Sequence, residues 1–472
     1  MILRLYNVSI PVIKMSMKPL NLKKIAEVTG GIYHGEESQK EQQIASVVKD
    51  HREATVNSLF VCFIGERVNG HDFVEHAFEN GAICCLVQKK IDSSHPYILV
   101  TSVIDALRLL AEYYRSLFTI PVIGITGSVG KTTTKEMTAA VLAQKYNILK
   151  TPGNSNNEIG VPLTLLSLTE EHEAAVIEMG ISEFGEMSRL AQMVRPDICI
   201  MTMIGYSHME NLKDLAGVLK AKSEVLSFMS SEGVLILNGD DEQLTKIHVN
   251  MKKITFGLSK SNMFYPEDIK QEGTEGLFFS ISGLVQSSQF FLPAFGVQLI
   301  PAALAAAAVG QLFHIEADQI AAGLRNYIPS GSRARICKTS CITILDDCYN
   351  ASPNSVLAAL RSLSTISGRK TAILGDMLEL GDLETEMHRQ VGNLASHIGL
   401  DCLICCGNKA EMIYRNAVAN PNGMETWYFP SKNELFSELP NLLNRNDTVL
   451  VKAAHSMHFE EIVDVLKTLD LR

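Results

Sequence analysis

The stretch Gly124-Ile-Thr-Gly127-Ser-Val-Gly130-Lys131-Thr132-Thr133-Thr134-Lys135-Glu136 decides the fold of the middle of this 472-residue chain. It continues an apolar run from Pro121 that is typical of a buried strand, and it leads into an amphipathic helix. Glycines let backbone N–H groups close on phosphate oxygens, and the helix N-terminus adds positive potential. The spacing departs from the common G-x-x-x-x-G-K-[ST] loop, since Ile125 stands where that pattern has glycine. We therefore expect this loop to bind a nucleoside triphosphate.

Each part of the loop has an expected role. Lys131 can reach the β- and γ-phosphates, and the hydroxyl of Thr132 can complete the coordination shell of Mg²⁺. The remaining phosphate contacts are expected from Gly127, Ser128, Val129, Gly130 and Thr133.

Composition and charge exclude several classes of protein. The chain is 46% hydrophobic and 20% charged, as ordinary soluble globular proteins are, and its length predicts roughly three domains. The net charge of −10 argues against a nucleic-acid-binding surface. No apolar run approaches a membrane span, and the first sixteen residues lack a signal-peptide cleavage site. The cysteines lie mostly in apolar runs, which indicates buried thiols in a reducing cytosol rather than a zinc site at Cys402 and Cys405.

The pattern along the chain predicts an α/β fold. A small α/β unit is expected before residue 117, and Ser330-Gly-Ser332 reads as a linker before a third unit. Continuous apolar strands alternating with helices, such as 136–144 and 212–229, indicate a parallel sheet covered on both faces. The central strands are expected at 122–126, 174–179, 197–202 and 233–238, and those of the third unit at 341–347, 371–376, 401–407 and 447–452.

Ligands of such sheets bind beyond the carboxyl ends of the strands, so the polar residues there are the candidates. Glu178 ends one strand and is placed to hold Mg²⁺ with Thr132; the alternative is a surface carboxylate. His208 follows the next strand, whereas a lysine on a helix, such as Lys222, is usually a solvated charge. Asp240 and Asp241 could orient a ribose or cap a helix.

An asparagine-rich loop is a second candidate for ligand binding. It contains Asn154, Asn156 and Asn157. Their amides both donate and accept hydrogen bonds, which suits sugar and phosphate oxygens, although asparagine also favours turns.

Together these residues resemble the Mur ligases, the ATP-dependent amide-forming enzymes of peptidoglycan assembly, from about residue 17 onward. Within that family the resemblance is to the ligases that add D-alanyl-D-alanine to UDP-N-acetylmuramoyl-tripeptide. The matching blocks are Ser58-Leu-Phe-Val-Cys-Phe-Ile-Gly-Glu-Arg67, Asn69-Gly-His-Asp-Phe73, Gly153-Asn-Ser-Asn-Asn157, Ile177-Glu-Met-Gly180, Leu345-Asp-Asp-Cys-Tyr-Asn-Ala-Ser-Pro353 and Leu374-Gly-Asp-Met-Leu-Glu-Leu-Gly381.

The resemblance implies three domains: a UDP-sugar-peptide domain (17–116), a central P-loop ATPase domain with a parallel sheet (117–330) and a C-terminal Rossmann-like domain (331–472). It implies that Glu178 and His208 are magnesium ligands and that Lys222 is carbamylated, an anion that supports the second Mg²⁺. It also implies that Arg333 reaches the γ-phosphate and that Asp347 binds the ATP ribose. Asp50 and Arg52 align with an Asp-Ser-Arg block at the uridine-nucleotide site, with His51 replacing serine.

Two departures from the family pattern lie in segments that face ligands. Gln298 and Ala302 replace a histidine and an asparagine, so one adenine contact should be missing. The segment Lys452-Ala-Ala-His455-Ser-Met457 replaces a Lys-Gly-Ser-Arg-x-Met pattern. Both departures suggest altered nucleotide affinity or another incoming amine.

The leading hypothesis is a cytoplasmic ligase, by default a monomer, that uses ATP and Mg²⁺ to join D-alanyl-D-alanine to UDP-N-acetylmuramoyl-tripeptide through an acyl phosphate. A related ligase with a different amine acceptor is the first alternative, and a non-catalytic sensor of UDP-muramoyl peptides is the second. Folylpolyglutamate synthase, a relative with the same loop, lacks the N-terminal uridine-nucleotide unit.

Overall fold

A computed structural model describes residues 17–286, 288–420 and 423–471. The stretch for which no signal peptide is expected lies outside these residues. The described chain forms two compact units: residues 17–119 with Pro162–Glu173, and Ile120–Val161 with Ala174 onward. None of the described helices is both long and apolar enough to cross a membrane.

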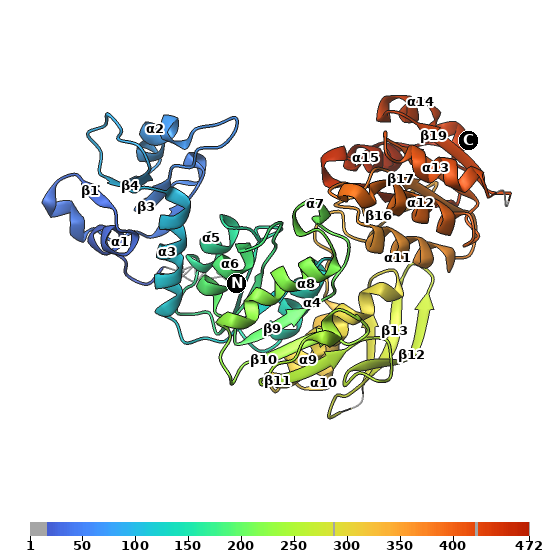
Figure 1. Cartoon of the computed structure of the whole chain (residues 1–472), viewed down its shortest axis with the longest axis horizontal. Coiled ribbons are helices and arrows are strands. Elements are labelled where there is room, and N and C mark those ends of the chain that lie inside the picture. Colours follow the sequence, from blue (N-terminus) through green and yellow to red (C-terminus); the bar gives the residue numbers. More distant parts are fainter. Residues whose placement is uncertain (1–16, 287, 421–422, 472) are drawn as a thin grey trace, which may run out of the picture. The chain divides into compact units, whose positions relative to one another are not determined.

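The first unit, drawn mainly in blue in Figure 1, is built on a five-stranded sheet in the order β1-β5-β4-β3-β2. β1 runs antiparallel to β5, and the other neighbours are parallel. Asn21 begins the first helix, because its side chain accepts a hydrogen bond from the backbone of Lys24. The elements are β1 (Ile32–His34), β2 (Ser46–Val48), β3 (Ser58–Val61), β4 (Ala82–Val87), β5 (Tyr97–Leu99), α1 (Leu22–Thr29), α2 (Val74–Glu79) and α3 (Val103–Ser116).

The second unit begins with a parallel six-stranded sheet in the order β11-β10-β9-β6-β8-β7. The sequence predicts the parallel arrangement and the four strands β6, β8, β9 and β10, but not the edge strands β7 and β11. The first strand in the chain, β6, therefore lies inside the sheet, and the phosphate loop leaves its carboxyl end. The strands are β6 (Val122–Thr126), β7 (Ile148–Lys150), β8 (Ala174–Glu178), β9 (Ile198–Met201), β10 (Val234–Asn238) and β11 (Lys252–Phe256). The helices of this unit are α4 (Lys131–Leu142), α6 (Glu186–Val194), α7 (Met209–Leu212), α8 (Leu215–Ser223), α9 (Ile300–Leu312) and α10 (Ala317–Arg325). α5 (Gly160–Leu165) begins at the end of the segment Ile120–Val161 and continues into Pro162–Glu173, which belongs to the first unit.

The helical segment expected at 212–229 is broken. Lys213 adopts a φ of +71°, which an α-helix cannot contain, and Asp214 then caps α8 by accepting from the backbone N–H of Gly217. A short 3₁₀ helix, Glu224–Phe228, follows α8. The prediction of one continuous helix is therefore wrong.

A three-stranded antiparallel sheet, absent from the sequence prediction, packs on the same core as α9. It consists of β12 (Tyr265–Glu272), β13 (Gly276–Ser282) and β14 (Gln289–Leu292). Its phenylalanines Phe279 and Phe290 share a hydrophobic cluster with α4 and with the alanines of α9. Small side chains let α9 and α10 approach α4 closely: a Cβ on Gly323 would lie 2.6 Å from the Cα of Val141.

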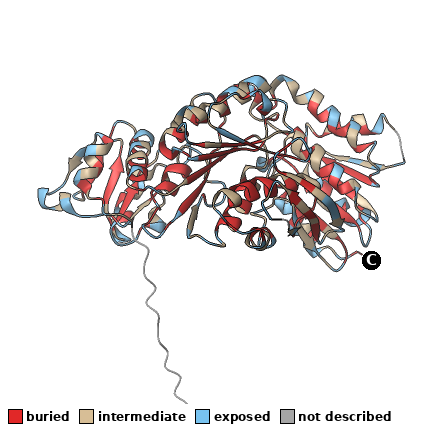
Figure 2. Ribbon diagram, turned by 90° about the horizontal axis from the view of Figure 1, so that it is seen from below, coloured by how far each residue is buried: buried red, intermediate tan, exposed pale blue. Residues whose placement is uncertain are grey.

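The last sheet has six strands in the order β15-β16-β20-β17-β18-β19, parallel except for β15. Figure 2 shows the buried residues concentrated in the strands and in the inner faces of the helices. The elements are β15 (Arg335–Lys338), β16 (Thr343–Asp346), β17 (Lys370–Leu374), β18 (Cys402–Cys406), β19 (Glu425–Phe429), β20 (Thr448–Lys452), α11 (Pro353–Ser364), α12 (Glu384–Ala395), α13 (Glu411–Val418), α14 (Lys432–Leu442) and α15 (Glu460–Thr468).

The cysteines are free thiols, and those expected to be buried are buried. Burial raises the pKa of the Cys402 thiol to about 12, which disfavours the thiolate that a metal would need. Among the described residues no three His, Cys, Asp or Glu side chains cluster as metal ligands.

Candidate active site

The phosphate loop depends on two glycines. Gly130, with a φ of +88°, is the residue before α4, and Gly127 has a φ of +145°. A Cβ at position 127 would collide with the hydroxyl oxygen of Thr202. Only glycine fits both demands, so the loop turns tightly at the end of β6 and presents the N-terminus of α4.

A cavity of about 520 Å³ opens at this loop, entirely within the second unit. Its walls come from the loop, from the ends of β8 and β9, and from the segments after residue 330. The expected site residues that line it are Ser128, Val129, Gly130, Lys131, Thr132, Thr133, Asn156, Glu178, His208, Arg333 and Asp347. Gly127 lies behind this lining but binds Lys131, whose Nζ donates to its carbonyl at 2.8 Å.

The side chain of Lys131 is held by backbone carbonyls of the phosphate loop. Its Nζ also contacts the carbonyl of Ser128 at 3.3 Å. Burial lowers the pKa of Lys131, and the charge of Arg333 lowers it further while Glu178 opposes the shift. Carbonyl oxygens offer weak partners to an ammonium group, so Lys131 can exchange them for phosphate oxygens.

Glu178 is fully buried, so the alternative interpretation as a surface carboxylate is wrong. Its Oε1 accepts hydrogen bonds from Thr132 Oγ1 at 3.1 Å and from Asn156 Nδ2 at 2.7 Å. Its Oε2 is buried without a hydrogen-bond partner and lies 3.6 Å from the Nζ of Lys135. A buried carboxylate oxygen without a hydrogen bond is costly, and beside a threonine hydroxyl it suits a divalent cation.

Lys135 is the residue that sequence reasoning missed here. It is fully buried, its Nζ lies 3.0 Å from Glu136 Oε1, and it donates to the carbonyl of Gly153 at 2.7 Å. The sequence does place it one helical turn after Lys131, on the helix that leaves the loop. The ammonium group of Lys135 therefore links α4 to Glu178 and to the backbone of the asparagine-rich loop.

His208 lies at the N-terminus of α7 with a φ of +55°. Its Nδ1 is 2.6 Å from Oε2 of Glu379, a residue of the loop after β17. The hydrogen bond to His208 lowers the pKa of Glu379.

Lys222 is 1% exposed, so the sequence-based expectation of a solvated charge is wrong. It does not belong to the cavity lining. Burial lowers its pKa well below the usual range, the charge of Lys131 adds to the shift, and the charge of Glu186 opposes it. No carboxylate in the described part of the chain forms an ion pair with it. Burial therefore disfavours the charged form of this amine.

The far wall of the cavity comes from the segments after residue 330. The guanidinium of Arg333 lies 3.7 Å from the ring centroid of Tyr349, on which His455 also stacks at 4.9 Å. Asp347 Oδ2 lies 2.6 Å from Nζ of the buried Lys452. Its Oδ1 accepts from the backbone of Ala334, so Asp347 also fixes the residue that follows Arg333.

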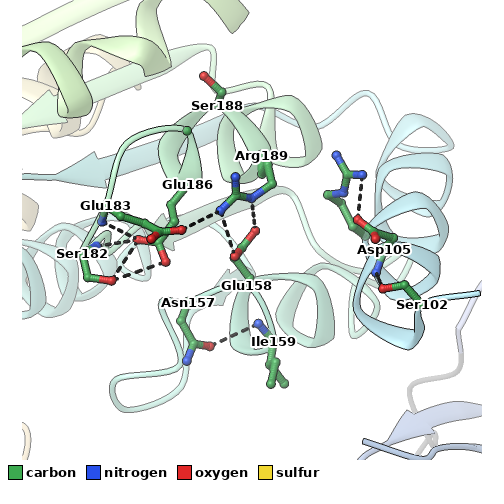
Figure 3. Close-up of polar contacts among 12 residues, drawn as sticks. Ser102, Asp105, Asn157, Glu158, Ile159, Ser182, Glu183, Glu186, Ser188 and Arg189 are labelled. Atoms are coloured by element: carbon green, nitrogen blue, oxygen red, sulfur yellow. Dashed lines mark hydrogen bonds and ion pairs between the residues drawn. The ribbon is translucent and has the colours of Figure 1, made fainter. Parts of the chain in front are cut away.

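The side chains of Asn154 and Asn157, in the asparagine-rich loop, make different kinds of contact. Asn154 donates to the hydroxyl of Tyr349 at 2.5 Å, whereas Asn157 accepts from the backbone N–H groups of Ile159 and Gly160 and so forms the turn before α5. Figure 3 shows Asn157 turned toward Ile159, and Glu158 facing Arg189 of α6 in an ion pair.

The remaining candidate residues are divided between this cavity and other parts of the chain. Asp241 accepts from the backbone N–H groups of Gln243 and Leu244, both at 2.9 Å, and so stabilises the turn before the 3₁₀ helix Leu244–Lys246. Asp50 and Arg52 belong to the first unit, where they form a hydrogen-bonded ion pair at 2.5 Å. Gln298 and Ala302 both line the cavity, and the amide oxygen of Gln298 accepts from the hydroxyl of Ser362.

Comparisons with known proteins identify this arrangement. Residues 125–310 match the Mur ligase middle domain, and residues 332–455 match the domain described as "Mur ligase, glutamate ligase domain". The UDP-N-acetylmuramoyl-tripeptide–D-alanyl-D-alanine ligase of Bacillus subtilis is 37% identical over 449 residues, which cover 94% of this chain and 97% of the relative. The chain belongs to the Mur ligase family.

Other members of the family also match this chain over most of its length, in sequence and in structure. The Escherichia coli enzyme of the same name is 34% identical over 92% of this chain and 96% of its own. A crystal structure of MurF from Acinetobacter baumannii superimposes with a TM-score of 0.87 at 27% identity, covering 96% of this chain and all of the other. MurF from Thermotoga maritima, solved with ADP, gives a TM-score of 0.80 at 25% identity, covering 90% of this chain and 97% of the other. The three-domain α/β fold predicted from the sequence is confirmed.

Proposed function

We propose that this Mur ligase joins D-alanyl-D-alanine to UDP-N-acetylmuramoyl-tripeptide, with conversion of ATP to ADP and phosphate. One observation carries the proposal: the phosphate loop, Glu178, His208 and Arg333 line one cavity at the carboxyl ends of a parallel sheet. That arrangement suits transfer of a phosphoryl group between two bound partners, because cationic and hydrogen-bonding groups surround the position of the γ-phosphate.

The reaction has two steps. A carboxylate oxygen of the peptide attacks the γ-phosphorus, the bond to the β-phosphate oxygen breaks, and ADP leaves with that electron pair. The amine of the dipeptide then attacks the acyl carbon, loses a proton, and expels phosphate as the amide forms. Lys131 and Arg333 stabilise the negative charge that spreads over the transferring phosphoryl group.

The residues fit a magnesium requirement. Thr132, Glu178 and His208 would hold Mg²⁺ together with phosphate oxygens, and the Oε2 of Glu178, which accepts no hydrogen bond, supports this assignment. When bound, the ion neutralises phosphate charge and orients the triphosphate. Carbamylation by CO₂ requires a neutral amine, and the burial of Lys222 favours that form; the carbamate would supply the anionic support for a second Mg²⁺.

The substrates are assigned by region. We place the UDP-sugar peptide on the domain 17–116, with Asp50 and Arg52 at the uridine nucleotide, and ATP on the domain 117–330, closed by the domain 331–472. Asn154, Asn156 and Asn157 adjoin the phosphate loop and would contact the peptide substrate. Asp347 is assigned to the ATP ribose, a role in which the contact with Lys452 would orient its carboxylate. A cytoplasmic monomer is the form that we propose.

The test is phosphate release by the purified protein with ATP, Mg²⁺, UDP-muramoyl-tripeptide and a panel of amines. Release that requires both the tripeptide and D-alanyl-D-alanine supports the proposal. Release only with another amine identifies a ligase of different acceptor specificity, and binding of the tripeptide without turnover identifies a sensor.

Two variants test the assigned roles. Lys131→Ala should abolish turnover, because it removes the cation at the β- and γ-phosphates. Lys222→Ala should also be inactive, and small carboxylates should restore part of its activity by replacing the carbamate. Full activity of either variant without an additive would contradict the mechanism.

A further inference from the structure

Glu379 contacts the segment that carries His208 twice, once through its carboxylate and once through its backbone carbonyl. The carboxylate of Glu379 lies 2.6 Å from His208 Nδ1, and the backbone carbonyl of Glu379 accepts from the N–H of Met209 at 3.0 Å. One contact fixes the imidazole, and the other fixes the first turn of α7, the element that carries it.

The loop that presents Glu379 is itself fixed on both sides. Met377 is fully buried and its N–H donates to His388 Nε2 at 3.0 Å, while Leu380 is 1% exposed. Between these anchors Glu379 adopts a φ of +60°. A left-handed glutamate persists only where its surroundings impose it, and such positions often serve function.

The carboxylate determines which imidazole nitrogen carries the proton. An ionised carboxylate only accepts hydrogen bonds, so at 2.6 Å the Nδ1 of His208 must be the donor. The neutral imidazole then keeps its lone pair on Nε2, the form in which histidine binds a metal. Histidine ligands commonly donate their second N–H to a carboxylate, which fixes the tautomer and the ring orientation.

We propose that Glu379 is a positioning residue of this enzyme, which holds His208 with its proton on Nδ1 so that Nε2 is available to a divalent cation. Glu379 does not line the cavity, so it acts only through His208. The inference rests on the proposed role of His208 as a metal ligand. It adds that the completed metal site requires a residue from the loop after β17, about 170 positions away in the sequence.

A surface ion pair is the alternative interpretation, and it makes a different prediction. The side chains of His208 and Glu379 are 31% and 59% exposed, and pairs with such exposure contribute little to folding. Glu379→Ala should therefore fold normally, so any change at the metal site can be assigned to positioning. Glu460 provides a matched control, since it pairs with His458 Nδ1 at 3.0 Å and lies outside the cavity lining.

The first measurement needs neither substrate nor metal. Long-range ¹H–¹⁵N spectra of the metal-free full chain should show His208 as the Nδ1–H tautomer, with the signal assigned by its loss in His208→Gln. In Glu379→Ala the signal should move toward the Nε2–H tautomer, whereas Glu460→Ala should leave it unchanged. Glu379→Gln, whose amide oxygen still accepts, should keep part of the original tautomer.

The second measurement is Mn²⁺ binding, followed by electron paramagnetic resonance with a saturating non-hydrolysable ATP analogue. Glu379→Ala should weaken Mn²⁺ binding by about 10- to 100-fold, with a smaller loss in Glu379→Gln and none in Glu460→Ala. An unchanged tautomer or an unchanged Mn²⁺ affinity in Glu379→Ala overturns the inference. Neither readout requires amide formation, so failure of the proposed reaction would leave this test intact.

Discussion

Replacement of Lys135 by methionine should destabilise the region around β8, the strand that carries Glu178. The substitution keeps most of the side-chain volume but removes the cation that lies 3.0 Å from Glu136 and 3.6 Å from Glu178. Both Lys135 and Glu178 are fully buried, and loss of one partner of a buried pair costs about 3–5 kcal/mol. The carbonyl of Gly153 also loses its donor.

Lys150→Met is the matched control, because Lys150 pairs with the same Glu136 but is 46% exposed. An exposed pair contributes about 0–1 kcal/mol, so the two variants should differ clearly although both remove a lysine from one glutamate.

Hydrogen exchange of a peptide that covers β8 measures the effect without assuming two-state unfolding. A loss of 3–5 kcal/mol should accelerate its slowest amides by about two to four orders of magnitude in Lys135→Met, against about fivefold or less in Lys150→Met. Adding Glu178→Gln to Lys135→Met should recover part of the protection, since it removes the unpaired charge. Exchange within fivefold of the wild type in Lys135→Met, or no recovery in the double variant, would refute the reasoning.

Three further changes test other parts of the site. Gly127→Ala places a Cβ against Thr202 Oγ1 at a backbone φ of +145°, so the KM for ATP should rise at least about tenfold; an unchanged KM would show that the loop tolerates a side chain. Ala302→Asn adds a hydrogen-bonding group to the cavity wall and should lower the KM for ATP by about two- to tenfold, a gain that a calorimetric titration with ADP should reproduce. His388 is buried, and burial lowers its pKa below 6.5, so the unfolded chain binds more protons below that pH and stability should fall as the pH falls from about 6.5. Urea midpoints followed by the fluorescence of Trp427 should show that fall, and it should be smaller in His388→Gln.

The parts of the fold that sequence predicted are those with local causes. The strand, glycine turn and helix around Lys131 are fixed by hydrophobic runs and by glycines that no other residue can replace, so they could be read directly. The helix break at Lys213 and the sheet β12–β14 were missed. The break depends on one backbone angle, and that sheet is stabilised by packing against α9, a helix distant in the sequence.

The site shows the same division between local and distant causes. The sequence by itself determined the phosphate loop, the family and the chemical types of the candidate ligands, because these follow from short spacings and from signature blocks. Only the tertiary structure decided that Lys222 is buried rather than solvated, that Lys135 neutralises Glu178, and that Glu379 holds His208. Burial and pairing depend on which distant segments pack against a side chain, and no spacing along the chain encodes that.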